Sequence, residues 1–341
     1  KAPKTKDIEY FRRTVNEFLM PFVMISSFKK SPMIKKKWDG VLWYSPSIFH
    51  GPFVNMLKLK SACKGYLIIR DIFPEWALDM KLIGRGFPYL FFRVIASYQY
   101  SIANYIGVQS FGNKVYFHKW EQKPFHDLQV LNNWLGKSAE ILCSIRLSET
   151  IFADRKVFVY AGNMGVAQDI DMLVNLAKSL EDKENIGFLF VGRGSEIGRL
   201  KDSVDELGLT NILFLNEIHP DEIPNLYAQC DIGMLSLDFK HKSHNIPGKF
   251  LSYMQNGLPV LAAINSGNDL AKIIRDEKVG QVCESNNLEE LNRLAKKLLN
   301  QIESDDGISE RCTNLFEREF SAKKAVDQII NAFNSNNIKA K

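Results

Sequence analysis

Two glycine-containing turns in the second half of the chain have the composition of a phosphate-binding site. The sequence GNMG at 162–165 follows the apolar segment 157–161, and GRG at 192–194 follows the apolar segment 186–191. Backbone N–H groups and the positive end of the following helix bind anions at such turns, and an arginine suits a diphosphate. A tight strand-to-helix connection without a ligand has the same sequence pattern, so each turn alone is weak evidence for a phosphate site. The phosphate-binding residues predicted here are Asn163, Gly165, Gly192, Arg193 and Gly194.

A lysine near the start of another predicted helix gives a stronger indication. Pro247 and Gly248 predict a turn, and Lys249 follows at the beginning of a helix expected at 249–255. A cation in the first turn opposes the helix dipole at a cost of roughly 0.3 to 1 kcal/mol. We therefore predict an anionic ligand at Lys249, with an exposed surface lysine as the alternative. His244 is either a donor to a sugar hydroxyl or phosphate or a solvent-exposed loop histidine.

Acidic residues and cysteines give no pattern typical of a metal site. Asp269, after Asn268, is either the N-cap of the helix predicted at 269–276, a carboxylate in its first turn, or a ligand of sugar hydroxyls. Asp169 and Asp171 match a D-x-D metal pattern, but they lie where acidic residues favour a helix start, so we expect no metal there. The five cysteines are scattered singly without a CxxC pair, which argues against zinc and against a disulfide framework.

Charged residues also follow a predicted strand in the first half of the chain. Arg70, Asp71 and Glu75 come after the strand expected at 66–69, at the strand end where open α/β sheets bind ligands. Asp71 is a candidate base or acceptor-orienting group, and the alternative is an ion pair with Arg70. These three residues form the predicted acceptor side of the site.

All of these residues lie at strand ends of two predicted Rossmann-like α/β domains. In the second half, continuous apolar strands alternate with helices, which is typical of a parallel sheet covered on both faces. The strands predicted there are 157–161, 186–191, 212–215, 232–235, 259–263 and 279–283. The first half has fewer, at 40–44, 66–69, 105–109 and 128–131, so we expect that domain to be incomplete. The predicted boundaries are 1–137 for the first domain, 138–154 for a linker, 155–315 for the second domain and 316–341 for a C-terminal helix able to pack back on the first.

Charge is divided unevenly along the chain. Residues 1–140 contain 21 Lys and Arg against 10 Asp and Glu, and the remainder contains 23 against 29. The basic half indicates either an anionic partner or a solvated basic face. The apolar run 18–25 precedes five lysines within 29–37, which is typical of shallow attachment to an anionic membrane; the alternative is a core helix followed by a polar loop. Nucleic acid is a minor alternative, because no recognition motif is present.

Several segments together resemble retaining glycosyltransferases of the GT-B fold, in the large family that includes sucrose-phosphate synthase. In the second half they are YAGNMG at 160–165, FLFVGRGSE at 188–196, IHPDEIPNLYAQCDIGMLSL at 218–237 and IPGKFLSYMQNGLPVLAA at 246–263. In the first half they are RDIFPEWALD at 70–79, IGVQS at 106–110 and LNNW at 131–134. Within that family, LWYSPSIFHGP at 42–52 and the stretch that ends in NSGNDL at residue 270 look like bacterial L-fucosamine transferases of O-antigen and capsule gene clusters.

The resemblance implies donor binding by the C-terminal domain, acceptor binding by the N-terminal domain, retention at the anomeric carbon, and no metal. Relatives commonly carry two glutamates eight positions apart; here those positions hold His244 and Ser252, which puts the usual ribose contact in doubt. Glu217 and Ile218 match the segment that meets the nucleotide base, and Gln168 replaces a common lysine. The donor-binding residues predicted in all are Asn163, Gly165, Gly192, Arg193, Gly194, Glu217, Ile218, Pro247, Gly248, Lys249, Ser252, Asn268 and Asp269, and the catalytic candidates are Asp71, His244 and Lys249.

We therefore expect a transferase that moves a deoxy-amino sugar, such as N-acetyl-L-fucosamine, from a UDP-sugar to a polyprenyl-linked acceptor in surface polysaccharide biosynthesis. Its expected location is cytoplasmic and peripheral, on the inner face of the cytoplasmic membrane, with contact through the basic half. No cofactor and no nucleic acid is expected. Two alternatives stay open: a UDP-sugar 2-epimerase, and a non-catalytic glycosyltransferase-like binding or partner protein.

Overall fold

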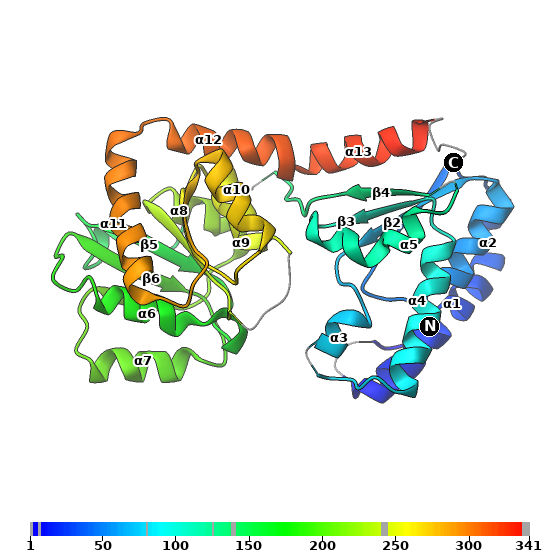
Figure 1. Ribbon diagram of the computed structural model, residues 1–341, viewed down its shortest axis with the longest axis horizontal. Coiled ribbons are helices and arrows are strands. Elements are labelled where there is room, and N and C mark those ends of the chain that lie inside the picture. Colours follow the sequence, from blue (N-terminus) through cyan, green and yellow to red (C-terminus); the bar gives the residue numbers. More distant parts are fainter. Residues whose placement is uncertain are drawn as a thin grey trace. The chain divides into compact units, whose positions relative to one another are not determined.

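The protein forms two compact units, each built around a parallel β-sheet. The computed structural model describes residues 3–5, 8–79, 81–124, 126–137, 141–239 and 245–335 (Figure 1). The first unit comprises Lys1–Leu131 with Val326–Lys341, and the second comprises Asn132–Ala325. Within the described ranges, no helix is both long enough and apolar enough to cross a membrane.

The first unit contains a four-stranded sheet in the order β1-β2-β3-β4, with every neighbouring pair parallel. Its strands are β1 (Gly40–Tyr44), β2 (Lys64–Ile69), β3 (Tyr105–Val108) and β4 (Asp127–Val130). Its helices are α1 (Tyr10–Lys29), α2 (Gly51–Ser61), α3 (Glu75–Asp79), α4 (Phe87–Ser101) and α5 (His118–Glu121). The four strands predicted for this half are confirmed to within two residues at each end. The apolar run 18–25 lies inside α1, which continues through Pro21.

The second unit contains a six-stranded parallel sheet in the order β10-β9-β8-β5-β6-β7. Its strands are β5 (Lys156–Ala161), β6 (Ile186–Val191), β7 (Ile212–Leu215), β8 (Ile232–Ser236), β9 (Val260–Ala263) and β10 (Gly280–Cys283). Its helices are α6 (Ile170–Lys178), α7 (Ile197–Glu206), α8 (Ile223–Tyr227), α9 (Gly248–Gln255), α10 (Asp269–Glu277), α11 (Leu288–Ser304) and α12 (Ile308–Leu315). All six predicted strands are confirmed. The chain leaves β5 toward β6 on one side and returns through β8 on the other, so the strand order reverses at β5.

Hydrophobic layers cover both faces of the second sheet, which explains why its strands are continuously apolar. Val159 and Leu189 face one layer, in which α9 contributes Tyr253. Phe158 and Phe188 face the other and stack with ring centroids 4.9 Å apart. Because both side-chain directions are buried, no polar alternation is possible along these strands.

The unit boundaries differ from the domain boundaries that we predicted. Leu135 pairs with the segment at Phe320–Ala322 in the second unit, where its N–H donates to Phe320 O at 3.0 Å. Leu147 and Phe152, inside the expected linker, are buried in the second hydrophobic core. The last helix, α13 (Ala322–Asn334), contributes residues to both units, and Phe333 packs on Tyr66 and Tyr105 of the first sheet.

Candidate functional site

A pocket of about 580 Å³ opens at the carboxyl end of the second sheet, beside the start of α9. Its walls come from the ends of β5 and β6, from the segment around Glu217 and α8, and from α9. Strand order reverses at β5, and open α/β sheets bind ligands at such a point. The volume lies within the ~300 to 1,000 Å³ range of small-molecule sites.

The two glycine turns join side by side through their backbones at the pocket rim. The Gly162 N–H donates to Val191 O at 2.8 Å, and the Met164 N–H donates to Arg193 O at 2.7 Å. A Cβ at Gly192, where φ is +149°, would lie 2.0 Å from Gly162 O. A Cβ at Gly194 would lie 2.0 Å from Met164 O. Glycine is therefore required here so that the two turns can approach each other, and this approach sets the shape of the rim.

The side chain of Lys249 lies against the backbone of the first glycine turn. A Cβ at Gly162 would meet its Cε at 2.6 Å, and its Nζ lies 4.6 Å from the centroid of the Tyr160 ring. Burial lowers the pKa of Lys249 to about 8. The Tyr160 hydroxyl donates to Asn163 O at 2.7 Å and so orders the same turn. A partly desolvated ammonium at the start of a helix thus points to an anion as its missing partner.

Arg193 also lines the pocket and pairs with Glu217. Its Nε is 3.3 Å from Glu217 Oε2, and the two side chains are 78% and 56% exposed. An ion pair this exposed contributes only about 0 to 1 kcal/mol. A diphosphate in the pocket can therefore replace Glu217 as the partner of the Arg193 guanidinium at little cost in free energy.

Tyrosine and serine side chains form the part of the pocket wall that comes from α8 and α9. Tyr227 is buried, forms a hydrogen bond with Ser252, and packs on Tyr253 with ring centroids 5.0 Å apart. Tyr253 in turn donates to Met234 O at 2.8 Å. Ser252, one of the two positions where relatives commonly have glutamate, is thus held in place by a buried tyrosine pair.

The structure brings most of the predicted donor-binding residues into one pocket. Those that line it are Asn163, Gly192, Arg193, Glu217, Ile218, Gly248, Lys249 and Ser252. Those that do not line it are Gly165, Gly194, Pro247, Asn268 and Asp269. Asn268 is the N-cap of α10, because its side chain accepts from the Leu270 N–H at 3.0 Å, and Asp269 lies in the first turn of that helix, one of the positions predicted for it. Gly162, part of the predicted GNMG turn, also lines it, and sequence reasoning missed Leu135, Gly136, Lys137, Ala161, Val191, Pro220, Asp221, Ile223, Pro224, Tyr227 and Gln255.

The other candidate residues have partners within the fold or lie outside the residues that the structure describes. Asp171 forms a two-pronged ion pair with Arg199 at 2.6 and 2.9 Å. Gln168 accepts from Asn163 Nδ2 and from the Gly165 N–H, both at 3.1 Å, so it orders the first glycine turn. Across the described part of the chain, no cluster of three metal-ligating side chains is present. His244 lies outside the described residues.

In the first unit, Arg70 and Asp71 follow β2 at the carboxyl end of that sheet. Arg70 Cζ lies 5.9 Å from the centroid of the Tyr44 ring. When the side-chain amide of Gln109 is oriented with its oxygen toward Arg70, this oxygen accepts from Arg70 Nε at 2.6 Å. Burial raises the pKa of Asp71, and the Arg70 guanidinium opposes this shift. The main-chain oxygen of Asp71 accepts from Ser45 Oγ at 3.2 Å. Glu75 begins α3, five residues after Arg70.

Comparison with solved structures places the fold in a known class. The chain is similar to the Anabaena protein Alr3699/HepE solved in complex with UDP-glucose, with a TM-score of 0.63 and 16% identity. That match covers 92% of this chain and 81% of the solved one. The fold is the GT-B fold of glycosyltransferases, with parallel sheets flanked by helices, as the sequence predicted.

The sequence comparisons give the family. The model of the family described as glycosyl transferases group 1 matches residues 144–314, half of the chain, and the protein belongs to that family. Among curated proteins it is 23% identical over 250 residues to the probable glycosyltransferase WbjE of Pseudomonas aeruginosa. It is 21% identical over 263 residues to the putative colanic acid biosynthesis glycosyl transferase WcaI of Escherichia coli K12. These matches cover 71% and 74% of this chain, which spans 62% of the length of each relative.

Proposed function

We propose that the protein is a glycosyltransferase that takes a hexosyl group from a UDP-sugar bound in the second-unit pocket. The observation that carries the proposal is Lys249, an ammonium held against Gly162 and the Tyr160 ring with its pKa lowered by burial. A diphosphate supplies the negative charge that this position lacks. The family match and the solved HepE complex with UDP-glucose support the same assignment.

The proposed role of the pocket residues follows from where negative charge develops during sugar transfer. When the bond between the anomeric carbon and the diphosphate breaks, negative charge grows on the departing phosphate. Lys249 and Arg193 stabilise that charge, and both side chains line the pocket before the reaction begins. The groups stabilise the transition state more than the bound donor because the charge on the leaving oxygen is then larger.

The finer features of the reaction are also proposals. The sugar is N-acetyl-L-fucosamine or a related deoxy-amino sugar, and it is transferred with retention to a polyprenyl-linked acceptor in surface polysaccharide synthesis. The resemblance of 42–52 and of the stretch ending at residue 270 supports this assignment, as does the similarity to WcaI, a putative glycosyl transferase of colanic acid biosynthesis. In the first unit Arg70, Asp71 and Glu75 face the acceptor, and the enzyme binds the inner face of the cytoplasmic membrane.

Calorimetric titration with UDP and a panel of UDP-sugars tests the donor site. We expect micromolar binding of UDP, weakened at least tenfold in Lys249→Ala, which corresponds to about 1.4 kcal/mol. Lys272→Ala, on the exposed surface of α10 away from the pocket lining, is the matched control and should bind as the parent does. No binding of any UDP compound would sink the donor assignment.

The same preparations separate the proposal from its two alternatives. Incubation with the tightest-binding UDP-sugar and no acceptor detects a 2-epimerase as a change of sugar configuration. Donor binding without transfer to any polyprenyl-linked acceptor favours a non-catalytic binding protein. Product formation only when donor and acceptor are both present supports the transferase, and the anomeric configuration of that product reports retention or inversion.

A further inference from the structure

A second, largely apolar cavity of about 450 Å³ lies in the first unit. It is lined by α1, by the segment before α2, by α3 with the loop that follows it, and by α4. The lining residues are Phe11, Arg13, Thr14, Glu17, Pro46, Ile48, Phe49, Phe73, Trp76, Ala77, Leu82, Ile83 and Phe92. Its two charged members pair with each other, because Arg13 Nε donates to Glu17 Oε1 at 2.8 Å. The lining therefore presents hydrocarbon and aromatic surface to whatever enters.

Aromatic rings give the cavity a firm wall. Phe73 and Phe92 meet edge to face with centroids 5.0 Å apart, and Phe73 also contacts Trp76 at 6.1 Å. Phe49 contacts Phe18 of α1 at 6.1 Å. Ile48 and Phe49 belong to a small buried cluster with Ala96 of α4, so the wall is anchored in a packed core. A wall of this kind keeps its shape without a ligand, which lowers the ordering cost of binding.

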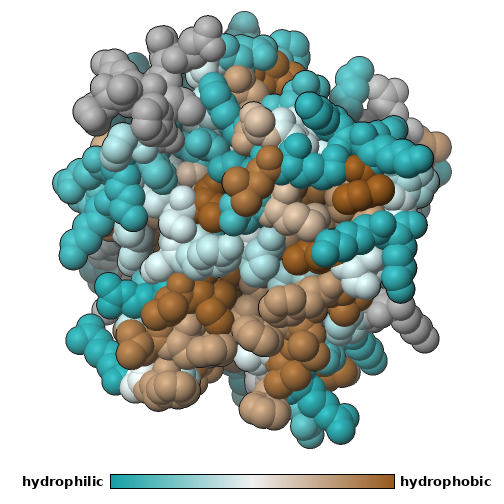
Figure 2. Space-filling model, turned by 90° about the vertical axis from the view of Figure 1, so that its right-hand side faces the viewer, coloured by the Kyte–Doolittle hydropathy of each residue, from teal (hydrophilic) through white to brown (hydrophobic). Residues whose placement is uncertain are grey.

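The surface around the cavity is also apolar. Figure 2, seen from the side of α1, α2 and α4, shows hydrophobic side chains gathered in the lower part of the view. Exposed apolar side chains on α1, α4 and the loop between α3 and α4 include Phe11, Val15, Phe18, Leu19, Phe22, Leu82, Phe87, Leu90, Phe91 and Val94. Phe11 and Phe87 are 78% and 80% exposed. Contiguous exposed apolar surface of this kind marks a membrane or ligand site.

The charge on the same segments is almost entirely positive. Residues 10–37 contain seven Lys and Arg against a single acid, Glu17, and residues 81–101 contain three against none. Arg12, Arg13, Arg85 and Arg93 are all exposed. An apolar cavity with a cationic border complements a molecule that has a hydrocarbon chain and an anionic head.

We propose that this cavity, called the chain cavity below, receives the hydrocarbon chain of a phosphate-bearing lipid while the surrounding cations hold its phosphate. The inference rests on the proposed function in one respect: the lipid is the carrier of the acceptor sugar. Each methylene group taken out of water contributes about 0.8 kcal/mol. Because the cavity opens on an apolar surface, a chain can enter it from a membrane without crossing water.

Photolabelling tests the chain cavity directly. The probe is geranylgeranyl phosphate with a diazirine at the far end of the chain, and the labelled peptides are located by mass spectrometry. We expect labelling confined to peptides from 11–17 and 73–92, and a loss of at least fivefold in Ala77→Trp, which fills the cavity. Ser97→Trp places the same ring on the exposed face of α4, outside the lining, and should label as the parent does. Leu82→Trp, at the exposed mouth, is the second cavity variant if Ala77→Trp melts early.

Each outcome decides a separate point. Labelling of peptides throughout the protein would overturn the proposal of the chain cavity. Labelling that is unchanged in both cavity variants would overturn it as well. Equal labelling by diazirine-bearing geranylgeraniol, which lacks the phosphate, overturns the role of the cations. UDP titration of the same samples keeps the two proposals apart: UDP binding with scattered labelling removes the chain cavity alone. Localised labelling without UDP binding removes the donor assignment and leaves the cavity.

Discussion

Lys249 destabilises the ligand-free fold, and the proposed binding of a diphosphate gives a reason for a lysine at this position. Burial lowers its pKa to about 8, so the folded protein holds the ammonium less favourably than the unfolded chain does. By linkage, this position lowers the stability of the ligand-free protein below pH 8, and the loss disappears as pH rises toward the ordinary lysine value. A bound diphosphate reverses the balance because it favours the charged form.

The affinity for UDP should therefore fall with pH in a range where an ordinary lysine does not titrate. Binding requires the protonated ammonium, whose free-state pKa is about 8, so UDP affinity should fall about tenfold between pH 7 and pH 9. Titration calorimetry across this range measures the fall. Lys249→Arg keeps its charge throughout and serves as the control for the titration of UDP itself. Parallel pH profiles for parent and Lys249→Arg would contradict the role given to the lysine.

The glycine turns give a second prediction at the scale of the residue. Gly192→Ala adds a Cβ that would lie 2.0 Å from Gly162 O at a φ of +149°, so the two turns must separate. We expect a loss of at least about 1 to 3 kcal/mol in the free energy of unfolding and a loss of UDP binding. Gly198→Ala is the matched control, because its Cβ has nothing within 4 Å on the exposed face of α7. That change should raise stability by roughly 0.5 to 1 kcal/mol. Equal stability of the two variants would refute the close approach.

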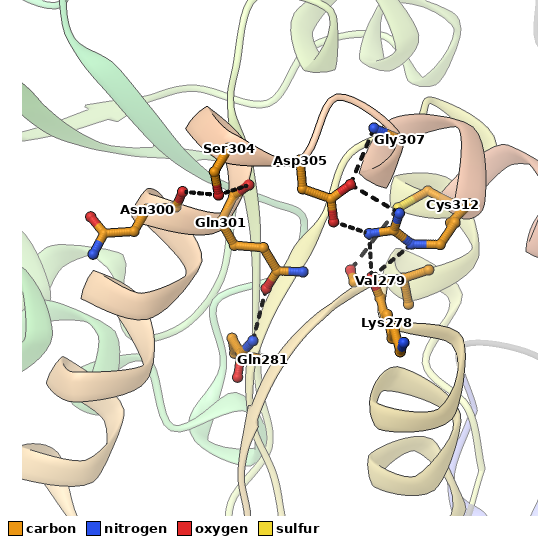
Figure 3. A network of polar contacts seen from close by, with 10 residues as sticks. Lys278, Val279, Gln281, Asn300, Gln301, Ser304, Asp305, Gly307 and Cys312 are labelled. Atoms are coloured by element: carbon orange, nitrogen blue, oxygen red, sulfur yellow. Dashed lines mark hydrogen bonds and ion pairs between the residues drawn. The ribbon is translucent and has the colours of Figure 1, made fainter.

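At the scale of elements, a polar network fastens α12 to the end of α10 and the start of β10. Figure 3 shows Asp305 beside Gly307 and the backbone at Lys278. Arg311 donates to Asp305 Oδ1 at 3.1 Å and, through Nη2, to Lys278 O at 3.2 Å. Lys278 has a φ of +55°, a conformation that costs about 1 to 2 kcal/mol outside glycine. Arg311 thus stabilises the left-handed backbone conformation at Lys278, which a lysine does not favour.

Removing the carboxylate should weaken this fastening in a pH-dependent way. The hydrogen bond from Arg311 lowers the pKa of Asp305, so its stabilising effect is complete above the unfolded pKa near 4 and is lost as pH falls through the folded value. Asp305→Asn should therefore lower the melting temperature at pH 7, and its difference from the parent should shrink as pH falls below 4. Asp306→Asn, on the exposed neighbouring residue, is the control and should melt with the parent at both values. A constant difference between Asp305→Asn and parent at all pH values would mean that charge is not the cause.

The strands could be predicted from the sequence, whereas the lining of the pocket could be predicted only in part. Continuous apolar runs such as 186–191, which are short and bounded by turn residues, indicate strands buried on both faces, and their ends locate the glycine turns. Lys137 and Tyr227 carry no local signal of this kind. Lys137 reaches the pocket because Leu135 pairs with a segment almost two hundred residues later, and Tyr227 reaches it by packing on Tyr253. Only tertiary contacts create such positions.

At the scale of the whole molecule, exposed apolar surface and cationic charge both occur on the first unit, which is the composition that the proposed membrane contact requires. An anionic bilayer attracts each nearby Lys or Arg with about 1 kcal/mol, and the exposed rings of α1 and α4 can then enter the interface. The triple variant Lys35→Gln, Lys36→Gln, Lys37→Gln should therefore weaken binding to phosphatidylserine-containing vesicles by roughly 3 kcal/mol, or about a hundredfold.

Vesicle co-sedimentation at low and at 0.5 M salt measures this change, and the difference should shrink at high salt because surface charges are screened. The matched control replaces three exposed lysines of the second unit, Lys201, Lys296 and Lys297, by glutamine. Equal loss in both triple variants would show that net charge alone drives binding, and that the first unit has no dedicated membrane face.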